Sequence, residues 1–171
     1  MPRSRAPLDI VRSVDTLGRR VLLWMIPLNL LLVAWVWFGR IVFGVGGWFL
    51  LIFLMTVVPV LLVGLLLTTA LAFTQPGRPR ALTRPQARAQ LATWAGMLLA
   101  GAFMPDFGDT EDSYLSLLTQ LFGRSDALLN LSWTLTLVFG GVTLVAWMVL
   151  LVTLVGGRTG RDDPAPVTAA R

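Results

Sequence analysis

The chain has 171 residues and a mean hydropathy of +0.75, with 56% hydrophobic and only 13% charged residues. Soluble domains carry about 25% charged residues, so this composition predicts a membrane protein. The chain contains no Cys, His or Lys, which excludes disulfides, thiol chemistry, His-based catalysis, the usual zinc sites and Schiff-base chemistry. We expect no cofactor.

Residues 1–20 form a basic segment in which apolar residues recur at helical spacing from Leu8 onward. A helix on the membrane surface and a partly ordered tail are both compatible with this pattern. Residues 21–38 are predicted to be the first span, with a kink at Pro27. Asn29 is expected to hydrogen-bond to another helix, and a position lining a pore is the alternative.

The short glycine-rich connection at residues 39–47 predicts an antiparallel helix hairpin. Its only charged residue, Arg40, is expected to extend toward lipid headgroups. Residues 48–73 contain no charge and form the second predicted span, about 39 Å long as a helix, with a candidate kink at Pro59.

Residues 88–104 form the third predicted span, which is short for a full crossing. It follows a helix start at Thr83 and Gln86, whose types and spacing match a capping box. Three of the spans also carry small residues every fourth position, which predicts close helix packing. These residues are Gly64, Thr68 and Ala72; Ala92, Gly96 and Ala100; and Ser132, Thr136 and Gly140.

Residues 105–126 form the acidic loop of the chain. Four carboxylates precede a predicted short interfacial helix at residues 113–122, with Asp109 or Thr110 as its N-cap. Carboxylate oxygens are ligands for Ca²⁺ or Mg²⁺, but their spacing matches no EF-hand, and a solvated loop that caps the helix is the favoured interpretation. The four weak metal candidates are Asp106, Asp109, Glu111 and Asp112.

Residues 127–155 form the fourth predicted span, and residues 156–171 a predicted disordered tail. The N-terminal segment, the second loop and the tail carry five, four and three arginines, against one in each other loop. The positive-inside rule then places both termini in the cytoplasm, with four crossings of the inner membrane of a bacterial cell. Anionic lipid headgroups, rather than nucleic acid, are the expected partner of the arginines. The expected contacts are Arg19, Arg20, Arg78, Arg80, Arg84 and Arg88.

The predicted fold is therefore all-α, a bundle of four transmembrane helices with a short extracytoplasmic interfacial helix. The spans contain no Asp, Glu, Lys or Arg in their middle, which disfavours coupled ion transport. The leading hypothesis is a non-enzymatic interaction or accessory subunit, with a membrane-protein partner or a second copy. A small channel using Asn29, Thr56, Asn130 or Thr136, and an envelope or lipid enzyme using the loop carboxylates, are the alternatives.

Overall fold

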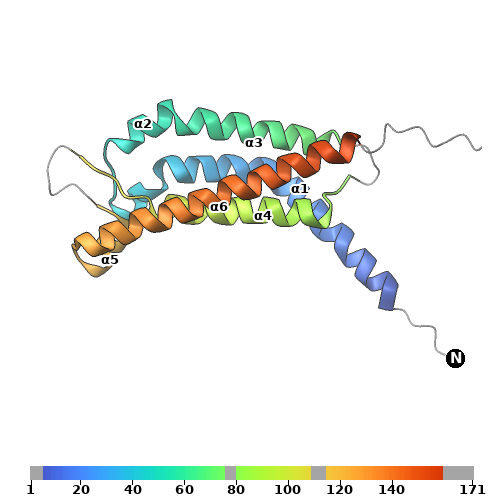
Figure 1. Ribbon diagram of the computed structural model, residues 1–171, viewed down its shortest axis with the longest axis horizontal. Coiled ribbons are helices and arrows are strands. Elements are labelled where there is room, and N and C mark those ends of the chain that lie inside the picture. The colour runs from blue at the N-terminus through green and yellow to red at the C-terminus, as the bar shows by residue number, and fades with distance from the viewer. Residues whose placement is uncertain (1–5, 76–79, 109–114, 160–171) are drawn as a thin grey trace, which may run out of the picture.

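The computed structural model describes residues 6–75, 80–108 and 115–159, and in these ranges the regular elements are helical, apart from one isolated β-bridge. The long helices lie side by side along the longest axis of the molecule (Figure 1). They are α1 (Ala6–Phe38), the pair α2 (Phe49–Met55) and α3 (Val57–Phe73), α4 (Arg84–Phe103) and α6 (Asp126–Thr159). The short helices η1 (Gly39–Phe43) and α5 (Leu117–Phe122) connect them at one end.

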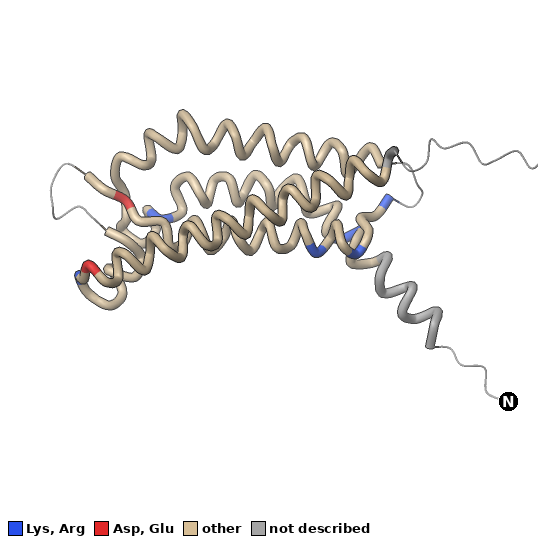
Figure 2. Tube along the Cα trace, in the orientation of Figure 1, with Lys and Arg blue, Asp and Glu red and all other residues tan. Residues whose placement is uncertain are grey.

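Two stretches, Thr16–Phe43 and Asp126–Gly157, are helical, long and apolar enough to cross a membrane. The α2–α3 pair is a third candidate if its 42° bend lies within one broken span. Figure 2 shows the charged residues of the described chain at the two ends of the helices, with an uncharged middle. The chain is thus an all-helical protein with two to three helices compatible with a membrane.

The two prolines inside the predicted spans have different consequences. Helix α1 continues through Pro27 without a break, whereas the helix at residues 48–73 is broken at Thr56. Pro59 has no N–H to donate to the carbonyl of Met55 four residues earlier, and its ring collides with that carbonyl. The break therefore falls in the turn before Pro59. At the break, both the N–H and the hydroxyl of Thr56 donate to the carbonyl of Ile52, at 3.0 and 2.6 Å.

Helix α4 is the centre of the fold, since its most extensive contacts are with α6 and α1. Gly96 permits this closeness: a Cβ there would collide with Thr143 of α6. Trp147 of α6 lies over Gly64 of α3 and donates from Nε1 to the Gly64 carbonyl at 3.3 Å. The small residues of α3 and α4 thus mark close contacts as predicted. Gly140 of α6 has no other atom within 4 Å of its Cβ position.

The capping box at Thr83 and Gln86 is confirmed, but two helix ends differ from the sequence expectation. Helix α5 begins at Leu117 with Ser116 as its N-cap, so the expected N-caps Asp109 and Thr110 are wrong. The Ser116 hydroxyl accepts from the N–H of Thr119, and Ser132 of α6 donates to the same hydroxyl at 2.8 Å. Helix α6 runs to Thr159, so the first residues of the expected tail are helical.

Candidate functional site: buried polar groups and an apolar cavity

Asn29 lies at the centre of a buried hydrogen-bond network between three helices. Its Nδ2 donates to the hydroxyl of Thr69 on α3 at 3.0 Å. Its Oδ1 accepts from Trp94 Nε1 at 2.8 Å and from Gln90 Nε2 at 3.2 Å, both on α4. The prediction that Asn29 bonds across to another helix is confirmed. The side-chain amide of Asn29 on α1 thus bonds to partners on both α3 and α4, and the network connects these three helices.

The second buried polar group of α4 faces α6. Gln86 donates from Nε2 to the carbonyl of Thr153 at 3.1 Å, while its Oε1 accepts from the N–H of Thr83. Gln86, Gln90 and Thr93 are all buried. These polar side chains lower the mean hydropathy of α4. For this reason α4 is not among the helices apolar enough to count as candidate spans, although other helices enclose it.

Arg40 and Asp106 form a buried ion pair where η1 meets the end of α4. Arg40 Nε lies 3.1 Å from Asp106 Oδ2, and each side chain is 1% exposed. The two atoms are not aligned for a hydrogen bond, so the contact is an ion pair. The guanidinium also lies over two rings, 5.0 Å from the centroid of Phe53 and 5.8 Å from that of Phe49.

The other carboxylate oxygen of Asp106 binds two backbone N–H groups near the ion pair. Asp106 Oδ1 accepts from the backbone N–H of Phe49 at 3.0 Å and of Phe107 at 2.9 Å. Gly47 allows this approach, because a Cβ there would collide with the carbonyl of Phe107. The expectation that Arg40 extends to lipid headgroups is therefore wrong: charge attraction and the two rings hold it inside the protein.

The structure describes only one of the weak metal candidates. Asp106 is buried against Arg40, and Asp109, Glu111 and Asp112 lie outside the described residues. Among the described residues, no group of three or more Asp, Glu, His or Cys side chains is placed to hold a metal ion. A cation site in the acidic loop remains a prediction.

The arginines expected to meet lipid headgroups gather at the opposite end of the helices from the Arg40–Asp106 pair (Figure 2). Arg19, Arg20, Arg80, Arg84 and Arg88 are exposed, and Arg78 lies outside the described residues. The N–H of Leu82 donates to the carbonyl of Gly18 at 3.4 Å, which brings the arginines of α1 beside those that precede and begin α4. The charged residues that Figure 2 colours at this end are all arginines.

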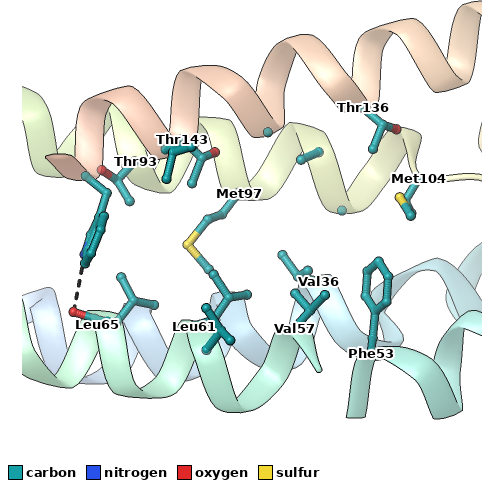
Figure 3. A pocket seen from close by; sticks show the side chains of 17 residues that line it. Val36, Phe53, Val57, Leu61, Leu65, Thr93, Met97, Met104, Thr136 and Thr143 are labelled. Atoms are coloured by element: carbon teal, nitrogen blue, oxygen red, sulfur yellow. Dashed lines mark hydrogen bonds between the residues drawn. The ribbon is translucent and has the colours of Figure 1, made fainter. Parts of the chain in front are cut away.

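A cavity of about 370 Å³ lies between α3, α4 and α6, with α1 and α2 at one end. Figure 3 shows Met97 reaching across it toward Leu61, with Thr136 and Thr143 on the α6 side. Phe53 and Met104 lie at the end near Arg40, and Trp147 and Leu65 at the other. The lining is almost wholly apolar.

The cavity is open to the outside of the protein between α3 and α6. Val60 of α3 and Leu144 of α6 both line it, and their side chains are 71% and 60% exposed. Gly140 lines it from α6 without any side chain to fill the space. A ligand could therefore enter sideways, from whatever medium surrounds these helices.

The polar residues proposed from sequence for a pore are not brought together. Asn29 is occupied in its own network, Thr56 bonds to its own helix, and Asn130 is exposed. Of these four residues, Thr136 alone lines the cavity, and its buried hydroxyl has no hydrogen-bond partner among the described residues. The arrangement contains no continuous polar path through these four side chains.

Sequence reasoning missed the ion pair and the cavity. Arg40 and Asp106 are far apart in the chain, and no local pattern indicates that they meet. The four-residue spacing of Thr136 and Gly140 was a usable signal, but it predicted contact with a helix and not an unfilled space. The chain was also compared with models of protein families, with curated proteins and with solved structures, and none of these comparisons found a significant match.

Proposed function

We propose that this chain is a four-span protein of the inner membrane, with both termini in the cytoplasm, that acts without catalysis by binding another membrane-spanning helix. That helix belongs either to a partner protein or to a second copy. The observation that carries the proposal is the outer face of α6. Only 11% of the most apolar 18-residue stretch of α6 is buried within the chain.

The exposed face of α6 includes a strip of glycine and valine that suits contact with another helix. Within a bilayer, helices associate where small side chains let their backbones approach closely, because lipid tails are as apolar as leucine. The valines on this strip recur at intervals of three and four residues and follow directly after a glycine, and the larger exposed side chains Leu137, Leu144 and Met148 lie beside them. The residues of the strip are Gly141, Val142, Val145, Val149 and Val152, all exposed.

The fourth crossing in this proposal is α4. Its 20 residues correspond to about 30 Å of helix, which equals the thickness of the hydrocarbon core. It runs alongside α6 (Figure 1), and its two buried glutamines, Gln86 and Gln90, bond to neighbouring helices. Arg19 and Arg20 of α1 lie beside the arginines at the start of α4, which supports a common cytoplasmic side.

Because the chain contains no Cys, single-cysteine variants test the association directly. In native membranes, Val145→Cys on α6, labelled with a maleimide that carries a photoreactive benzophenone, is expected to form crosslinked species after illumination, either at twice the mass or with a heavier partner. Val63→Cys, equally exposed on α3 (69% against 64%), is the matched control and is expected to remain monomeric. Equal, low crosslinking of the two variants would contradict association through α6.

A further inference from the structure

We propose that the cavity between α3, α4 and α6 binds one acyl chain of a bilayer phospholipid. The inference rests on the membrane topology proposed above, and it does not depend on the association through α6. The medium outside the mouth of the cavity, between Val60 and Leu144, is then lipid hydrocarbon.

The size of the cavity suits an acyl chain. It extends along α6 from Thr136 to Trp147, about 16 Å at the rise of a helix. One leaflet contributes half of a hydrocarbon core of about 30 Å. A whole helix, with a diameter of about 10 Å or more, is too wide for a volume of 370 Å³.

The apolar lining disfavours water and polar ligands as occupants of the cavity. Apolar cavities of this kind stay dry, because a buried water needs several polar partners. The hydroxyls of Thr93 and Thr143 already donate to carbonyls of their own helices. Thr136 also lines the cavity, and among the described lining residues its Oγ1 is the one buried polar side-chain atom without a hydrogen-bond partner.

The position of the cavity identifies the leaflet. Phe53 and Met104 mark one end of the cavity. The ring of Phe53 lies against Arg40, and Met104 is two residues before Asp106. The cavity therefore starts at the end of the helices with the ion pair and ends near their middle. The acyl chain belongs to the leaflet on the side of Arg40, which is the outer leaflet in the proposed topology.

The test uses the full chain in vesicles of phosphatidylcholine and phosphatidylglycerol that contain a trace phospholipid with a photoreactive diazirine in one acyl chain. After illumination, mass spectrometry maps the labelled residues. Labelling is expected at Met97, which is 2% exposed and reachable only from within the cavity, as well as at exposed residues such as Val152. Labelling confined to exposed residues would overturn the proposal.

Two adjacent glycines supply a matched pair of variants. Neither Gly140 nor Gly141 has an atom near its Cβ position, but only Gly140 lines the cavity. Gly140→Leu is expected to reduce labelling of Met97 about tenfold, because each displaced methylene group weakens binding severalfold. Gly141→Leu should leave this labelling unchanged, and equal labelling of Met97 in both variants would overturn the proposal.

The two glycine variants also distinguish a failure of the lipid-binding proposal from a failure of the proposed association through α6. Gly141→Leu is expected to reduce crosslinking through α6, where Gly141 lies on the outer face, without affecting the labelling of Met97. Circular dichroism checks that each variant is folded. If Gly140→Leu does not fold, Ala100→Leu fills the same cavity from α4 and carries the same expectation.

Discussion

Asp106 uses both of its carboxylate oxygens to connect parts of the chain that are far apart in sequence. Oδ2 lies against Arg40 of η1, and Oδ1 accepts from the N–H groups at the start of α2 and after Asp106 itself. A buried ion pair is weak evidence for stability, but removal of one partner leaves an unpaired charge in a medium that solvates it poorly. The pair therefore enforces one arrangement of the loops at this end.

Asp106→Asn is expected to lower the free energy of unfolding by about 3–5 kcal/mol, because it leaves Arg40 buried without a counter-charge. The asparagine oxygen can still accept from Phe49 and Phe107, so the charge is the main change. Unfolding in mixed detergent micelles, followed by circular dichroism, measures the difference. Asp126→Asn, at an exposed position, is the control.

The double variant Asp106→Asn with Arg40→Met should recover a large part of the lost free energy of unfolding, because neither charge then remains buried. Additive losses in the double variant would show that the two side chains do not act as a pair.

At the scale of the element, Pro59 separates α2 from α3 and turns α2 through 42°. The turn brings the start of α2 against the segment after α4, where the N–H of Trp48 donates to the carbonyl of Phe107 at 2.9 Å. Pro27 produces no such break in α1. The bend thus positions Phe53 at the end of the cavity and close to Arg40.

Pro59→Ala is expected to restore the hydrogen bond to the carbonyl of Met55 and to straighten the α2–α3 pair. A seven-residue helix turned back through this angle moves its far end by roughly 7 Å. Spin labels at Leu51 of α2 and Leu144 of α6, both exposed, report this displacement as a change in distance.

Pro27→Ala in α1 should leave the same distance unchanged. If Pro59→Ala also leaves it unchanged, the contacts of Trp48 and Asp106, and not the proline, hold the bend.

At the scale of the whole molecule, charge is separated from the apolar middle along the long axis (Figure 2). One described end carries exposed arginines, and the other carries the Arg40–Asp106 pair. Between the ends, the helices expose many large apolar side chains, which a bilayer accepts without cost. A membrane orientation with the arginine-rich end in the cytoplasm agrees with this distribution.

Membrane-impermeant maleimide tests this orientation in intact cells. Ser125→Cys, before α6, is expected to react from outside, whereas Arg80→Cys, before α4, should react only after lysis, because the two positions lie on opposite sides if α4 crosses. Reaction of both variants from the same side would show that α4 does not cross. External reaction of Arg80→Cys alone would reverse the proposed orientation.

Composition and local patterns alone determined the helical class, the apolar segments and the need of Asn29 for a partner, because each depends on neighbouring residues or on the cost of an unpaired polar group in an apolar surrounding. The capping box at Thr83 has the same local origin. The pairing of Arg40 with Asp106, the N-cap at Ser116 and the cavity beside Gly140 were decided only by the tertiary structure. Each depends on which distant segments meet and on whether their side chains fill the space between them, and no periodicity along the chain contains that information.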